Sequence, residues 1–110
     1  YTCADNNGNK FCDACGALLR CLNGCTDGND IYENVLGNPG MAVGGSGDVL
    51  AGLISAFSAQ GNSPLLSALA GVYIHSLAGD MAALETGEIS LLPRDIINFI
   101  PYAIKYSMKQ

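Results

Sequence analysis

The chain has few charged residues, and basic residues are the scarcest of them. Only 14% of its 110 residues are charged, with five Lys or Arg against ten Asp or Glu and a net charge of −5. The basic residues cluster on no predicted face: they are Lys10, Arg20, Arg94, Lys105 and Lys109. Because nucleic-acid binding depends on a basic surface, we expect no nucleic-acid partner. The charge does not exclude nucleotides, whose phosphates can be held by backbone amides.

Apolar runs of membrane-spanning length and a secretory leader are also missing. No apolar stretch reaches the roughly 20 residues that a membrane helix needs, and no charged segment precedes a short apolar core. The sequence begins at Tyr1 without an initiator Met. We therefore expect a fragment of a soluble protein with no membrane partner.

Cysteine is absent after Cys25, although the first quarter holds five. These are Cys3, Cys12, Cys15, Cys21 and Cys25. An odd number leaves one thiol unpaired, and in a secreted disulfide-rich protein we would expect cysteines along the whole chain. We therefore expect a reducing, cytoplasmic location.

The cysteine spacing also allows a zinc site, although not a typical one. Cys12, Cys15, Cys21 and Cys25 could formally supply four thiolates. The gap between the two pairs is far shorter than in zinc ribbons, and residues 16–20 are predicted to be helical. Incidental thiols are favoured over zinc and over a redox or disulfide role.

The composition changes near Asn34, from Asn, Asp, Gly and Cys before it to Ala, Leu, Ile and Gly after it. Residues 30–35 are predicted to form a strand that leads into a glycine-rich segment, and residues 1–4 and 10–12 are further strand candidates. Strand, loop and helix in this order are typical of an α/β unit.

Three helices are predicted after that strand. Ser46 is expected to cap the first, which runs to about residue 60. Ser63 is expected to cap the second, with Pro64 at its first position and its end at Gly87. A short third helix begins at Pro93, and Pro101 is expected to interrupt it. A second row on the second helix is made mostly of small residues, which would let another helix or a sheet approach closely: Ala68, Gly71, His75, Ala78, Gly79 and Ala82. Two buried faces on one helix predict that it forms a middle layer.

The glycine-rich segment is the most informative motif. Residues 44–47 read Gly-Gly-Ser-Gly, and Asp48 follows at the start of the first predicted helix. Small residues let the backbone approach a ligand, while the free N–H groups and the dipole of a helix N-terminus favour an anion. An acid at this place makes chemical sense as a general base that faces the group attacking a phosphate. Neither the P-loop pattern nor the dinucleotide-binding pattern is complete.

Three blocks in order carry a resemblance to a known family: residues 37–54, residues 71–83, and residues 92–97 with Pro101. They resemble the ADP-dependent NAD(P)H-hydrate dehydratases, which are carbohydrate-kinase-like members of the ribokinase superfamily. The resemblance covers about residues 27–106 and corresponds to the C-terminal third of such a domain. It implies the mostly helical C-terminal part of a three-layer α/β/α domain over residues 27–110. Residues 1–26 form a Cys/Asn/Gly-rich segment outside that assignment.

The resemblance also implies a reaction and roles for individual residues. The enzymes repair hydrated NADH or NADPH by phosphorylating its added hydroxyl from ADP, with AMP and phosphate as products. Gly47 would contact the nucleotide phosphate, the amides of Gly44, Gly45, Ser46 and Gly47 would stabilise the transferring group, and Asp48 would bind the hydroxyl and take its proton. Asn38 is a further candidate for nucleotide binding. Mg²⁺ would accompany ADP or ATP, and we expect a homo-oligomer in the complete protein and no activity from these residues alone.

Two other residues and two other functions stay open. His75 is the only histidine and is expected to be a hydrogen-bonded structural residue, while Asp80 fits either a site-facing acid or an anchor for a neighbouring loop. An ATP-dependent kinase of the same superfamily, acting on a sugar or vitamin precursor, is one alternative function. A noncatalytic cysteine-rich metal-binding or interaction module is the other.

Overall fold

A computed structural model describes residues 20–21 and 32–108, in two units that comprise Tyr1–Val35 and Leu36–Gln110. In the first unit, strand β1 (Arg20–Cys21) pairs antiparallel with β2 (Tyr32–Glu33), so that Arg20 lies opposite Glu33. The strand predicted over residues 30–35 is thus confirmed at its centre. The helix predicted over residues 16–20 is wrong at Arg20, which pairs in the ladder. The strands predicted at 1–4 and 10–12 and the possible zinc ligands other than Cys21 lie outside the described residues.

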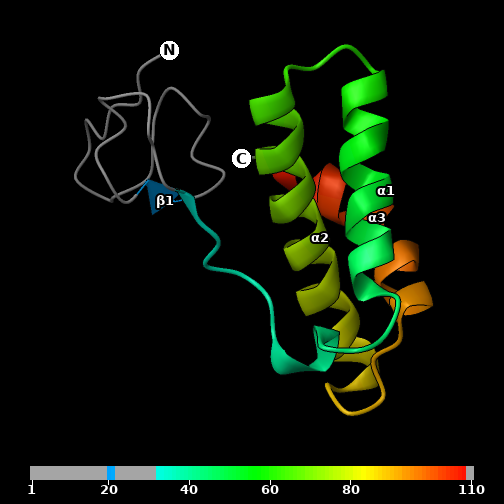
Figure 1. Cartoon of the computed structure of the whole chain (residues 1–110). Helices are drawn as coiled ribbons and strands as arrows, with labels where there is room; N and C mark the ends of the chain where they lie inside the picture. Colours follow the sequence, from blue (N-terminus) through cyan, green and yellow to red (C-terminus); the bar gives the residue numbers. More distant parts are fainter. Residues whose placement is uncertain (1–19, 22–31, 109–110) are drawn as a thin grey trace. The chain divides into compact units, whose positions relative to one another are not determined.

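All the secondary structure in the described part of the second unit, residues 36–108, is helical. A single 3-10 turn, η1 (Pro39–Met41), precedes α1 (Ser46–Ala59), α2 (Pro64–Thr86) and α3 (Pro93–Ser107). Helix α2 packs extensively against both α1 and α3, which touch each other much less. Figure 1 shows α1 and α2 side by side and joined by a short connection. The prediction that the second helix packs on two faces is confirmed.

Local chemistry explains both ends of α2. The Ser63 hydroxyl accepts the N–H of Leu66 at 3.1 Å, and Pro64 occupies the first turn, where no N–H is needed. At the other end Gly87 adopts φ +80, a conformation that favours glycine, and donates to the carbonyl of Ala83. The sequence-based prediction of both caps is confirmed.

The small residues of α2 allow two close approaches. A Cβ on Gly71 would lie 2.4 Å from Ile54 Cγ1 of α1, and a Cβ on Gly79 would lie 2.3 Å from Met41 Sδ of η1. At Gly71 the neighbours include the Cα of Ile54, so packing requires glycine there, whereas at Gly79 the neighbour is the flexible Met41 side chain, which would have to move to admit a Cβ. The buried apolar core gathers residues from all three helices and the segment before α3: Leu53, Ile74, Ala78, Ala82, Leu91, Ile96 and Ala103.

Helix α3 runs through Pro101 without a break, so the predicted interruption is wrong. Proline removes one backbone hydrogen bond and crowds the preceding turn. Here Pro101 is exposed while Ile96 and Ala103, on either side of it, are buried in the core. Core packing of the flanking turns keeps the helix continuous. At its start, the Asp95 carboxylate accepts the N–H of Leu92 at 2.9 Å.

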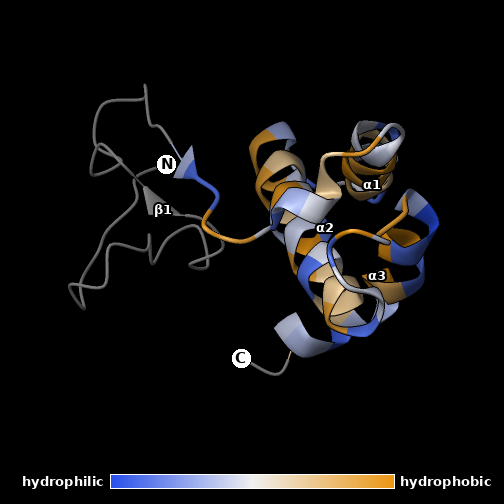
Figure 2. Cartoon of the chain, turned by 90° about the horizontal axis from the view of Figure 1, so that it is seen from below, coloured by the Kyte–Doolittle hydropathy of each residue, from blue (hydrophilic) through white to orange (hydrophobic). Residues whose placement is uncertain are grey.

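Among the described residues, α2 is the one helix with the length and apolar composition of a membrane span. Half of its apolar stretch of 18 residues is buried inside the unit, and the core helix of a soluble protein passes the same test. Figure 2 shows hydrophobic residues predominating in α1 and α2, whereas α3 carries more hydrophilic ones on its outer side. The expectation that no segment reaches membrane-spanning length therefore does not hold for α2 by length and composition alone.

Candidate phosphate site at the start of α1

A tight turn leads into α1. The N–H of Ser46 donates to the carbonyl of Val43 at 3.1 Å, which closes a turn over Gly44 and Gly45. Gly45 has φ +99, and a Cβ there would lie 3.1 Å from Pro93 Cγ. The left-handed conformation favours glycine at this position, and a side chain would also be tight against the start of α3.

Beyond that turn the backbone offers several unused donors. Within the described residues, the N–H groups of Gly44, Gly45, Gly47 and Asp48 have no hydrogen-bond partner. A Cβ on Gly44 or Gly47 would meet nothing within 4 Å. The packing of this unit therefore does not require glycine at either position. The absence of a side chain at both leaves open space beside the unused N–H groups. Such a cluster of N–H groups at the positive end of a helix suits an anion.

Ser46 departs from its predicted role in two respects. The N-cap of α1 is Gly45, which has no side chain to form a cap bond, and Ser46 is the first helical residue. Its side chain is buried, and its N–H is already used in the turn. The left-handed glycine moved the helix start by one position. Of the four small residues, Ser46 therefore offers neither a free amide nor an exposed hydroxyl.

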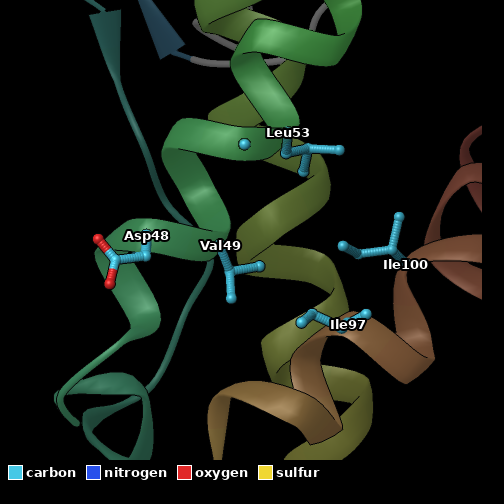
Figure 3. Close-up of a pocket in the computed structure, with 6 residues that line it drawn as sticks. Asp48, Val49, Leu53, Ile97 and Ile100 are labelled. Atoms are coloured by element: carbon cyan, nitrogen blue, oxygen red, sulfur yellow. The ribbon is translucent and has the colours of Figure 1, made fainter.

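Asp48 is exposed and is the third residue of α1. In the described residues no hydrogen bond or ion pair involves its carboxylate. Figure 3 shows that this carboxylate points away from Ile97 and Ile100 of α3. It therefore stands free beside the unused amides, where a general base would have to be accessible.

An apolar groove lies between α1 and α3, close to Asp48. Its volume is about 440 Å³, and its lining combines residues from both helices: Asp48, Val49, Gly52, Leu53, Ile97 and Ile100 (Figure 3). Ile97 is 51% exposed. The groove adds an apolar surface next to the polar loop.

His75 reaches the same loop from α2. Its Nε2 lies 3.0 Å from the carbonyl oxygen of Ser46 and 3.5 Å from the Ser46 hydroxyl. Because a carbonyl oxygen can only accept, Nε2 carries the proton and donates. Burial lowers the pKa of His75, an effect that the hydrogen bond to Ser46 partly offsets. The side chain is a buried, hydrogen-bonded imidazole whose charged form is disfavoured by burial.

Asp80 holds the segment that precedes η1. Its two oxygens accept from the backbone N–H of Gly37 at 3.0 Å and from Asn38 Nδ2 at 2.8 Å. Asn38 in turn accepts the N–H of Gly40 through Oδ1 at 3.0 Å and thereby caps η1. Of the two interpretations of Asp80, its observed contacts are those of a loop anchor. The amide of Asn38 is committed to the same network.

Sequence reasoning missed the hydrogen bond between His75 and Ser46 and the packing of Gly79 against Met41. Neither has a local signal, because the partners lie 29 and 38 positions apart. The capping role of Asn38, by contrast, did have a local sequence signal. Asparagine directly before proline is a common start of a helical turn, with the proline at the first position.

The candidate site is thus a glycine-rich loop with unused N–H donors and an exposed carboxylate, at the N-terminus of a helix. The sequence profile of the family described as NAD(P)H-hydrate dehydratase matches residues 25–102, more than half of the chain. The chain belongs to this family of carbohydrate-kinase-like proteins. That membership implies a ribokinase-like fold.

Curated relatives agree with this assignment. The bifunctional NAD(P)H-hydrate repair enzyme Nnr of Moorella thermoacetica is 44% identical over 75 residues, which cover 68% of this chain and 14% of the relative. The Nnr of Coxiella burnetii is 55% identical over 65 residues, or 59% of this chain and 13% of the relative. The ADP-dependent (S)-NAD(P)H-hydrate dehydratase of Cenarchaeum symbiosum is 41% identical over 80 residues, or 73% of this chain and 28% of the relative. The chain thus spans less than a third of each.

Proposed function

We propose that this chain supplies the phosphate-binding loop and the general base of an ADP-dependent NAD(P)H-hydrate dehydratase. The observation that carries the proposal is the group of unused N–H donors at the start of α1, immediately beside the exposed carboxylate of Asp48. Family membership and the activities for which the relatives are named support the same substrate pair, ADP and hydrated NAD(P)H.

In the proposed reaction, Asp48 binds the hydroxyl of the hydrated nicotinamide ring and takes its proton. The hydroxyl oxygen then attacks the terminal phosphorus of ADP, and the bond from that phosphorus to the AMP oxygen breaks. The amides of Gly44, Gly45 and Gly47 would stabilise the charge on the transferring group. Loss of phosphate breaks the ring C–O bond, and loss of a proton from the neighbouring carbon restores the double bond.

Ser46 has a different part in this proposal from that of the glycines. Since its N–H donates to Val43, it shapes the turn that presents the neighbouring amides rather than contacting phosphate. Asn38 likewise caps η1 and binds Asp80, which suits a residue that fixes the loop.

Mg²⁺ is expected to neutralise the phosphates of the nucleotide. Within residues 20–21 and 32–108 no cluster of three ligating His, Cys, Asp or Glu side chains is present. Mg²⁺ commonly keeps several waters and binds through substrate phosphates with one or two carboxylates. No step of the proposed mechanism depends on a metal held by these residues.

Other features of the complete protein remain predictions. We expect a three-layer α/β/α domain in which residues 27–110 supply the C-terminal portion, a homo-oligomeric assembly and a cytoplasmic location. An ATP-dependent small-molecule kinase would use the same loop, but the relatives are named as NAD(P)H-hydrate dehydratases and repair enzymes.

The test is Asp48→Asn in the full-length product of the gene that encodes this chain. Turnover of hydrated NADH with ADP should fall by at least about 10²-fold because the base is lost. Affinity for AMP should change little, since asparagine is nearly isosteric and the amides remain. Undiminished turnover would contradict the role of Asp48.

A further inference from the structure

One peptide group connects His75 to the open side of the glycine loop. Its carbonyl belongs to Ser46 and accepts from His75 Nε2 at 3.0 Å, and its N–H belongs to Gly47. A trans peptide is planar, so its C=O and N–H point in opposite directions, and none of the described peptide bonds is cis. The hydrogen bond that fixes the carbonyl therefore also fixes the direction of the Gly47 N–H.

The two sides of this peptide group differ in their surroundings. On the carbonyl side, His75 is only 8% exposed and belongs to the middle helix. On the amide side, the N–H of Gly47 has no partner within the described residues, and a Cβ on Gly47 would meet nothing within 4 Å. A buried donor thus binds the carbonyl of this peptide group, while its N–H stays available to a ligand.

Hydrogen bonding at the carbonyl also changes the strength of the amide as a donor. Chained hydrogen bonds polarise one another, so a peptide whose carbonyl accepts an additional bond presents a more positive N–H. The carbonyl of a first-turn helical residue already accepts from the helix itself. His75 adds a second donor to the same oxygen.

We infer that His75 is a positioning residue, which orients and polarises the Ser46–Gly47 peptide so that the Gly47 amide can bind the phosphate of a nucleotide. This inference rests on the proposed function. His75 acts through the peptide and touches neither nucleotide nor substrate. His75 should therefore raise the affinity for ligands that carry a phosphate and leave the affinity for a nucleoside without phosphate unchanged.

The experiment compares two variants of the full-length gene product. His75→Gln keeps a donor at a reach similar to that of Nε2, whereas His75→Met has a similar size and no donor. Affinities for AMP and for adenosine are measured by calorimetry, together with kcat and KM for ADP. We expect His75→Met to weaken AMP about tenfold, the scale of one hydrogen bond. Adenosine binding should stay within about twofold of the wild type, and His75→Gln should restore most of the AMP affinity.

Each outcome decides between the two claims. Equal losses for AMP and adenosine in His75→Met, or no loss at all while the wild type binds AMP and turns over, would overturn the positioning role and leave the proposed function standing. A wild-type protein that binds neither AMP nor ADP would overturn both. If His75→Met shows no cooperative unfolding transition, His75→Asn takes its place, because its amide is one carbon too short to reach the Ser46 carbonyl.

Discussion

The Asp80 carboxylate accepts a 2.8 Å hydrogen bond from the side-chain amide of Asn38, across 42 positions of the chain. The other Asp80 oxygen accepts the N–H of Gly37, and Asn38 Oδ1 accepts the N–H of Gly40. One acid on α2 thus organises the segment that leads into the glycine loop. The network consists of three hydrogen bonds, all formed by the side chains of Asp80 and Asn38.

Exchanging these two residues should test the network. Asp80→Asn places an amide opposite donors, so one bond is lost and the unfolding free energy should fall by about 1 kcal/mol. Asn38→Asp brings two carboxylates together and should cost more. The double variant can remake all three bonds, because the new amide on α2 would donate to the new carboxylate before η1 and still accept the N–H of Gly37. Thermal denaturation should therefore show the double variant to be more stable than Asn38→Asp alone; additive losses would contradict the arrangement.

Alanine substitutions in the glycine loop should separate folding from binding. Gly45→Ala forces a side chain into a left-handed conformation against Pro93, so we expect a loss of about 1–2 kcal/mol in unfolding free energy. Gly47→Ala meets no neighbour, and alanine is a better helix former, so stability should be unchanged or rise by up to about 1 kcal/mol. AMP affinity should nevertheless fall, because the methyl group occupies the space beside the free amides.

Chemical denaturation and AMP titration of both variants measure these two effects. The matched pair makes the comparison sharp, since the two changes add the same methyl group two positions apart. A Gly47→Ala variant that binds AMP as tightly as the wild type would contradict close approach of the phosphate to Gly47.

Local signals predicted the parts of this fold that depend on neighbouring residues. Ser63 and Pro64 define the start of α2 because a serine hydroxyl can accept a first-turn N–H and proline fits the first helical position. The predicted N-cap of α1, Ser46, is one residue too late. The N-cap is Gly45 in a left-handed conformation, which the sequence alone does not predict. Pro101 predicts an interruption of the third helix, but α3 is continuous because the turns on either side of Pro101 pack into the core.

The candidate site was predictable to a similar extent. The glycine-rich run and Asp48 carry their chemistry in consecutive residues, so the motif could be found without coordinates. The contacts of His75 with Ser46 and of Asp80 with Asn38 join residues 29 and 42 positions apart. Such pairs depend on how α2 packs against the loop, and one sequence alone does not reveal them.

Packing between α1 and α2 should depend on the absence of a side chain at Gly71. A Cβ there would lie 2.4 Å from Ile54 Cγ1 and 3.3 Å from its Cα, and the β-branched isoleucine has little rotamer freedom in a helix. We expect Gly71→Ala to lower the unfolding free energy by about 1–3 kcal/mol. In an Ile54→Ala background the same change should cost much less, because Cγ1 is gone. Equal costs in both backgrounds, measured by denaturant unfolding, would argue against this contact.

Stability should also depend on pH through His75. Its folded-state pKa lies below the ordinary value of 6.5, because burial disfavours the charged form. Between these two values the unfolded chain binds more protons than the folded one, so the unfolding free energy falls as pH decreases below about 6.5. Above about pH 7.5 both states are neutral at this residue and its contribution is constant. One proton limits the slope to about 1.4 kcal/mol per pH unit.

His75→Gln is the matched control for this prediction, since it keeps a donor toward Ser46 but cannot titrate. Denaturant unfolding between about pH 5 and pH 8 should show a steeper loss of stability toward acid for the wild type than for the variant. Ordinary carboxylates titrate near pH 4, so their contribution in this window is small and common to both proteins. Parallel curves for the two proteins would mean that His75 takes up its proton equally well in the folded and unfolded states, and that it is not held neutral by burial.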